Sequence, residues 1–113
     1  MRRVGNISGE AIQRHTIVFE QSEISLTLRF YPRVQIWAFD AEYRDRAIYG
    51  AKLSVGVLHM ESRNLPFDFI VTDESGNGLD PFRLDDFEQG RCRLYLLEPE
   101  DMLRVRNNAE VPL

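Results

Sequence analysis

The sequence predicts an all-β, mainly antiparallel domain, either a small sandwich or a partly open barrel of about seven short strands. Apolar side chains alternate with polar ones at a period of two along most of the chain, which is typical of strands with one buried face. Turn-forming residues separate these runs at short intervals. Helical spacing is limited to one or two short turns near the C-terminus, so we expect little helix.

The chain of 113 residues is long enough for one domain with a single core. We expect a flexible N-terminal leader at residues 1–15, a β domain at residues 16–101 and a C-terminal tail at residues 102–113. Residues 1–15 and 107–113 lack apolar periodicity, so they cannot bury enough surface alone to offset the entropy lost on ordering. Both ends should therefore be disordered in the free chain and ordered on assembly.

The first half of the β domain should contain three strands, at residues 16–20, 24–30 and 34–40. The middle strand alternates most clearly, with Ile and Leu on one face and Ser and Thr on the other. Pro32 cannot donate a ladder hydrogen bond, so it marks the turn before the third strand. That third strand is apolar on both faces, which indicates a central strand or an interface.

The second half should continue in the same way after a polar hairpin connection at residues 42–46. Gly50 interrupts the next strand pair, and a turn rich in Asp, Gly and Asn occupies residues 73–81. Pro99 is suited to a first helical position and is followed by two acids, which favours a short helix at residues 99–105. A further helical turn is expected at residues 85–89. The remaining strands are expected at residues 47–49, 53–60, 67–71 and 91–97.

Composition excludes several classes of function. A net charge of −4 argues against nucleic-acid recognition, which depends on clustered basic residues. No apolar stretch approaches the roughly 20 residues of a membrane span, and the two N-terminal arginines lack the apolar segment of a signal peptide. Cys92 is the single cysteine, so no intrachain disulfide can form, and we expect synthesis in a cytoplasm. Its expected role is that of a small buried hydrophobic residue.

No credible catalytic site is visible, and we expect neither an enzyme nor a cofactor. Serine or cysteine nucleophiles need a nearby base, and the two histidines, His15 and His59, are in the leader and in an alternating strand. His59 is expected to be a hydrogen-bonded structural histidine. Sequence motifs for zinc proteases, thiol redox chemistry, serine hydrolases and phosphate binding do not occur.

One acidic loop, Asp73–Asp86, leaves a metal site open as an alternative. The twelfth place of the EF-hand-like pattern should carry a bidentate acid, but it is Leu84. An ordinary turn accounts for the same residues. The alternative function is therefore a carbohydrate- or calcium-dependent binding module, with Trp37 or Tyr31 as a stacking platform; a small hydrolase is a third. The residues that match the first, third, fifth and sixth places are Asp73, Ser75, Asn77 and Gly78.

The order of several segments resembles a known family. They are LRF at residues 28–30, IWAFD at 36–40, IYGAKLSVGV at 48–57, FIVTDESGNGLDPFRLDDF at 69–87 and GRCRLYLLEPED at 90–101. Over residues 16–101 the chain looks like the small baseplate plug proteins of contractile-tailed, myovirus-like bacteriophages. The resemblance implies a structural subunit on the tail axis, in several copies, contacting hub, spike, tube or tape-measure proteins. It also implies a place in the virion tail baseplate after synthesis in the bacterial host cytoplasm.

Candidate interface residues follow from chemistry, because aromatic and arginine side chains are enriched in binding hot spots. Most of these aromatic residues also have a plain interpretation as core residues, and for Trp37 the core is the favoured one. Arginine also suits bidentate recognition of carboxylates on a partner, and Lys52 is the one lysine among 14 basic residues. The candidates are Tyr31, Trp37, Phe39, Tyr49, Phe82, Arg2, Arg3 and Arg14.

Overall fold

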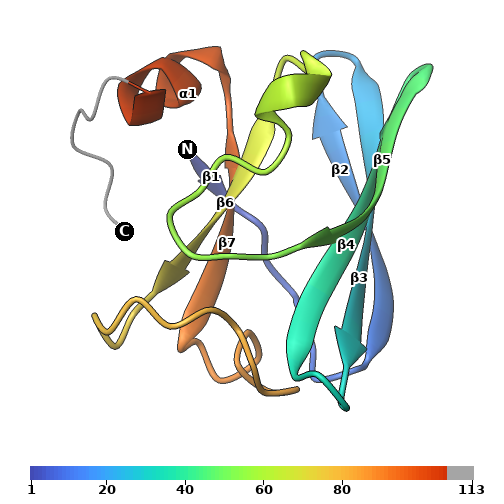
Figure 1. Ribbon diagram of the computed structural model, residues 1–113. Coiled ribbons are helices and arrows are strands. Elements are labelled where there is room, and N and C mark those ends of the chain that lie inside the picture. Colours follow the sequence, from blue (N-terminus) through green and yellow to red (C-terminus); the bar gives the residue numbers. More distant parts are fainter. Residues whose placement is uncertain (107–113) are drawn as a thin grey trace.

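The computed structural model describes residues 1–106, in which two antiparallel sheets pack face to face (Figure 1). One sheet has four strands in the order β2-β3-β4-β5, and the other has three in the order β1-β7-β6. The predicted all-β sandwich is confirmed, and the sheets do not close into a barrel. The elements are β1 (Arg2–Arg3), β2 (Ile12–Phe19), β3 (Ser22–Tyr31), β4 (Ile36–Tyr43), β5 (Arg46–Lys52), a 3-10 turn η1 (Glu61–Arg63), β6 (Asp68–Asp73), β7 (Cys92–Leu97) and α1 (Pro99–Arg106).

The four-stranded sheet is a meander, so its turns alternate between the two ends of the sandwich. Two-residue loops join β2 to β3 and β4 to β5, and both lie at one end. Residues 32–35 join β3 to β4 at the opposite end, which is the lower end in Figure 1. The β3–β4 turn and the two short hairpin loops therefore lie at opposite ends of the sandwich.

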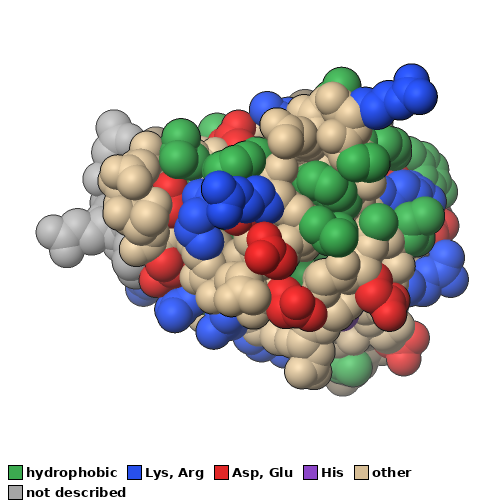
Figure 2. All heavy atoms as spheres, turned by 90° about the horizontal axis from the view of Figure 1, so that it is seen from below, with side chains coloured by type: hydrophobic (Ala, Val, Ile, Leu, Met, Phe, Trp, Pro, Cys, Tyr) green, Lys and Arg blue, Asp and Glu red, His purple; other side chains and the backbone are tan. Residues whose placement is uncertain are grey.

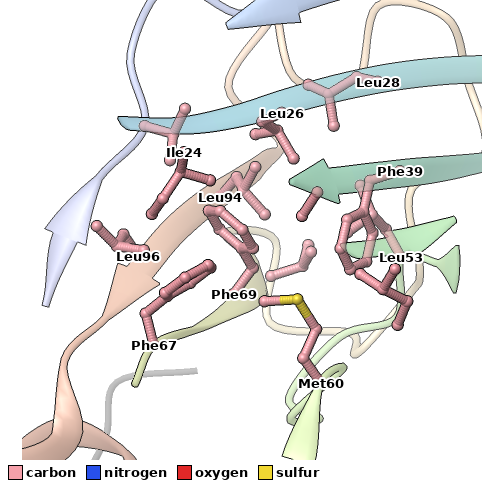
Figure 3. Close-up of a cluster of buried hydrophobic side chains, with 14 of the residues drawn as sticks. Ile24, Leu26, Leu28, Phe39, Leu53, Met60, Phe67, Phe69, Leu94 and Leu96 are labelled. Carbon is pink, nitrogen blue, oxygen red and sulfur yellow. The ribbon is translucent and has the colours of Figure 1, made fainter. Parts of the chain in front are cut away.

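The core lies between the sheets and is built by the alternation seen in the sequence. Ile24, Leu26 and Leu28 are fully buried on the inner face of β3, where they meet side chains from the opposite sheet (Figure 3). Phe67 and Phe69 pack edge to face with ring centroids 5.8 Å apart. Aromatic pairs of this geometry add stability beyond the area that they bury. The predicted inner face of the second strand is therefore confirmed.

A second apolar cluster lies on the outer face of the three-stranded sheet. Helix α1 packs Met102 against Ile70 of β6 and Leu97 of β7. All six residues of β6 are buried: Phe69 and Val71 face the core, Ile70 packs in the cluster with Met102 of α1, and Asp68 accepts from the His59 and Met60 amides. The helix predicted near the C-terminus is confirmed. None of the helices within residues 1–106 is long and apolar enough to cross a membrane.

The predicted strand at residues 53–60 is wrong, apart from a single parallel bridge between Val55 and Val71. Side chains take the place of a strand ladder here: the Val55 amide donates to Asp80, and the Met60 amide donates to Asp68. Gly56, at φ 73°, also turns the chain away from an extended course. The predicted helical turn at residues 85–89 forms hydrogen-bonded turns without a helix.

The N-terminal segment is placed differently from the expected leader. β2 begins at Ile12, four residues before the expected start at 16, and β1 pairs with β7 through Arg2 and Arg3. The Val4 amide donates to the Leu94 carbonyl, and its side chain is buried. The expectation for residues 107–113 lies outside the described residues.

Flexibility of the N-terminal end in the free chain stays a prediction, now narrowed to the residues before β2. We expect trypsin to cleave after Arg2 and Arg3 earlier in the digest than after Arg14. Two residues of β1 are paired with a neighbouring strand and eight of β2 are, so β1 should open more readily. Mass spectrometry of a limited digest measures the order of cleavage, and assembly should protect the early sites. Equal resistance at all three arginines would place this segment firmly in the domain fold.

Candidate interaction surface

An exposed apolar surface covers the end of the sandwich where the β3–β4 turn meets residues 74–91. The Trp37 indole N–H donates to the Arg83 carbonyl at 2.9 Å, which fixes this loop against β4. Figure 2 views the molecule from this end and shows hydrophobic side chains gathered beside charged ones. We call the surface formed by the β3–β4 turn and residues 74–91 the end face. The large exposed or half-buried apolar residues of these two segments are Tyr31, Val34, Leu79, Phe82 and Leu84.

The exposure of these side chains is substantial. Val34, within the β3–β4 turn, is 64% exposed, and Tyr31, at the end of β3, is 43% exposed. Phe82 is half-buried, and the guanidinium groups of Arg83 and Arg91 lie 5.3 and 5.1 Å from its ring centroid. An apolar patch rimmed by charged residues is typical of a protein-binding surface.

Arg91 organises the loop beneath the end face. Its Nε and Nη2 donate to the two carboxylate oxygens of Asp86, at 2.9 and 2.8 Å. Its Nη1 lies 3.2 Å from Asp73 and donates to the Leu79 carbonyl at 3.0 Å. Both carboxylates are almost completely buried, so a single guanidinium neutralises two buried acids and closes the loop.

The pKa values of these acids follow from the same contacts. Burial opposes ionisation of Asp73, but hydrogen bonds from Ser75 and the Leu79 amide, together with the charge of Arg91, lower its pKa to about 2. Burial likewise opposes ionisation of Asp86, and bonds from Arg91 and two loop amides outweigh it and lower its pKa. Both acids are therefore ionised at neutral pH as part of the loop structure.

This geometry bears on the calcium alternative. The oxygens of Asp73 accept hydrogen bonds from the Ser75 amide and hydroxyl and from the Leu79 amide, and Arg91 Nη1 already places a positive charge 3.2 Å from this carboxylate. Within residues 1–106, no three His, Cys, Asp or Glu side chains are grouped so that they could hold a metal ion.

We expect calcium to leave the stability of the protein unchanged. A site filled at 100 times its Kd would add about 2.7 kcal/mol to the free energy of unfolding. The melting temperature should be the same in millimolar calcium and in a chelator, because Arg91 already neutralises Asp73. A rise with calcium that the Asp73→Ala substitution abolishes would contradict this prediction.

The candidate interface residues separate into core and surface positions. Trp37 and Phe39 are completely buried between the sheets, so in this fold neither can reach a partner. Their burial also removes Trp37 as a stacking platform for a carbohydrate. Tyr31 and Phe82 belong to the end face, whereas Tyr49 is 66% exposed on β5 and donates to Glu42 at 3.2 Å.

The three arginine candidates lie away from the end face. Arg2 and Arg3 are exposed on β1, and Arg2 reaches across to the Val18 carbonyl at 2.8 Å. Arg14 is exposed on β2. The structure thus brings the eight candidates to the core, the end face and the edges of both sheets, with no single site that unites them.

The two histidines and the cysteine are held by hydrogen bonds or burial within the fold. His59 Nε2 accepts from the Ser54 amide, and its Nδ1 donates to the Phe69 carbonyl at 2.8 Å. His15 contacts Gln13 at 2.8 Å, and partial burial lowers its pKa. Burial raises the pKa of the Cys92 thiol to about 12, which makes the thiolate scarce at neutral pH.

Sequence reasoning missed several exposed apolar residues. Val34 was assigned to a strand, although its position after Pro32 and Arg33 in a short turn is a usable signal for exposure. Leu79 and Leu84 lie among acids and glycines, a context that indicates a loop but not which of its side chains face solvent. The partners that hold these loops are distant in sequence, so they could not be identified from local pattern.

Comparison with models of known protein families identifies a family to which this chain is similar. Residues 3–99 match the family model described as cyanophage baseplate Pam3 plug gp18. A search of curated proteins gives no match. The matched residues run from β1 to the beginning of α1 and include both sheets and the end face.

Proposed function

Because the chain belongs to the family of the cyanophage baseplate plug, we propose that it is a structural subunit of a contractile phage-tail baseplate. We further propose that it occupies the tail axis in several copies and contacts hub, spike and tube or tape-measure proteins. It would be made in the host cytoplasm and act without catalysis or a cofactor. The observation that carries the proposal is the family match across the whole sandwich, and the exposed end face supports it with a surface suited to a protein partner.

Purified phage particles provide the test of this proposal. Antibodies against the protein, carried on gold particles, should label the baseplate end of the tail, and mass spectrometry should detect the chain in purified tails. Detection only in the lysate, with none in washed particles, would overturn the proposal.

The role of the end face is tested by a charge placed within it. Val34→Asp should leave the free energy of unfolding within about 0.5 kcal/mol of the wild type, because the side chain is largely in solvent. Incorporation into tails should fall by about tenfold or more, because an unpaired carboxylate would be buried against the partner.

Val18 offers a matched control, since it is also 64% exposed but lies on β2, outside the end face. Val18→Asp should leave both stability and incorporation near the wild-type level. If both variants assemble normally, the end face is not the docking surface. If both fail equally, the effect is a general response to surface charge.

A further inference from the structure

The end of the sandwich opposite the end face holds a cavity of about 430 Å3, which we call the arginine pocket. It lies where the β2–β3 and β4–β5 loops meet the segment after η1, at the upper end in Figure 1. Four of its residues come from the β4–β5 hairpin, and two of these are arginines, Arg44 and Arg46. The lining residues are Glu20, Tyr43, Arg44, Asp45, Arg46, Asn64, Leu65 and Pro66.

Both arginines of the pocket have donors to spare. Arg44 contacts the Glu20 carbonyl at a long 3.5 Å and lies 5.1 Å from the centroid of the Tyr43 ring. Arg46 donates to the Asn64 carbonyl. Within residues 1–106, neither guanidinium forms an ion pair with a carboxylate, although acids line the same cavity. A guanidinium has five N–H donors arranged to bind a carboxylate through two of them, so most of this capacity is unused.

The turns around the pocket fix the course of its backbone. Glu20, Arg44 and Asn64 have φ values of 48°, 56° and 55°, in the left-handed region that favours glycine. Glu20 and Arg44 lie in two-residue hairpin loops, which commonly need positive φ values, and Asn64 ends η1. All three residues line the cavity. The tight β4–β5 loop therefore places Arg44 beside the cavity.

We propose that the arginine pocket binds a carboxylate-bearing segment of a neighbouring protein. The two guanidinium groups, which form no ion pair within residues 1–106, supply donors for a carboxylate. Tyr43, Leu65 and Pro66 supply apolar contact for the rest of that segment. The inference goes beyond the proposed function, because it assigns a second docking site and its chemistry. The inference rests on the proposed function in one respect only, namely that the neighbouring protein belongs to the phage tail. A subunit with an apolar end and an arginine-bearing end can join two different neighbours.

The charge around the pocket favours a short acidic protein segment over nucleic acid. Glu20 and Asp45 line the cavity beside the arginines, and the whole chain carries a net charge of −4. A long polyanion would meet both the local acids and the overall negative field, whereas one or two carboxylates can pair with the arginines alone.

The direct test titrates the purified full-length chain with an acetylated and amidated hexapeptide that carries two glutamates among neutral residues. At low salt we expect saturable binding that weakens as salt rises, and a loss of affinity of about tenfold or more in the Arg44→Gln, Arg46→Gln double variant. Arg33→Gln is the matched control, because Arg33 is exposed in the β3–β4 turn at the other end. Its affinity should equal that of the wild type.

Several results would overturn the proposal: no binding by the wild type, equal loss in the control, unchanged affinity in the double variant, or tighter binding of a single-stranded oligonucleotide to the same arginines. These outcomes concern the purified chain, so they are distinct from failure to find the protein in phage tails. Folding is checked separately with Arg44→Gly. Glycine relieves the φ of 56°, so this variant should melt at or above the wild-type temperature and still bind more weakly. Full affinity in Arg44→Gly would count against the pocket.

Discussion

Replacing Arg91 by methionine should lower the free energy of unfolding by roughly 3 kcal/mol, the cost expected when a nearly buried ion pair loses one partner. The substitution leaves Asp73 and Asp86 buried without a cation, and it removes donors to the Leu79 and Asp80 carbonyls. Removing one partner of a buried ion pair costs about 3–5 kcal/mol, and the lower value is expected here because Arg91 is partly exposed. The melting temperature should fall by about 10 °C or more, measured by thermal denaturation.

The pH dependence identifies the cause of that loss. Asp73 and Asp86 have lowered pKa values in the folded protein, so their contribution to stability is present above the unfolded pKa near 4 and is lost as the pH falls. For Asp73 the loss continues to a pH of about 2. The difference between the wild type and Arg91→Met should therefore shrink as the two acids are protonated and the pH falls towards 2.

Arg83→Met provides the control for the Arg91 variant. Arg83 also stacks on the Phe82 ring but forms no ion pair within residues 1–106, so its loss should cost under about 1 kcal/mol. If the two variants lose equal stability, stacking on Phe82 is the source of the effect. If the loss in Arg91→Met does not change with pH, the carboxylates are not involved.

Trp37→Ala should destabilise the protein by about 3–5 kcal/mol, because it deletes a completely buried ring and leaves the Arg83 carbonyl without its indole partner. Trp37→Phe keeps an aromatic ring, so its loss should be smaller, about 1–3 kcal/mol for the unpaired carbonyl and the reduced volume. Chemical denaturation measures both values. Tyr49→Ala, at a side chain that is 66% exposed, should cost under about 0.5 kcal/mol.

These variants also decide between the two sequence interpretations of Trp37. A core residue loses stability when truncated, whereas an interface anchor loses assembly and keeps its stability. Trp37 is the single tryptophan of the chain, so its fluorescence reports the same site directly. Emission typical of water-exposed tryptophan in the folded protein would contradict its burial.

The sequence predicted the elements whose structure depends on local pattern. Residues 24–30 alternate strictly, and β3 places their apolar side chains in the core. The short helix after Leu97 begins at Pro99, where proline and two acids favour a helix start. In both places the local sequence was sufficient to predict the element, because its conformation does not depend on a residue far away in the chain.

The failures share the opposite cause. Residues 53–60 look like a strand, but the buried carboxylate of Asp68 and the partly exposed carboxylate of Asp80 accept hydrogen bonds from their amides. β1 has two residues and forms through pairing with β7, which is more than 90 positions away in the chain. The candidate site was predicted only in part for the same reason. Tyr31 was identified by residue type, whereas the exposure of Val34 and the bridging role of Arg91 depend on tertiary contacts.

The central claim is that this sandwich is a baseplate subunit held through its two ends. A cryo-electron microscopy reconstruction of the intact tail baseplate tests that claim most directly. We predict density for the sandwich on the tail axis, with Val34 and Leu84 of the end face against one neighbour. Arg44 and Arg46 should lie against carboxylates of another. A baseplate in which every subunit is assigned to other proteins, or in which both ends of this chain face solvent, would contradict the account.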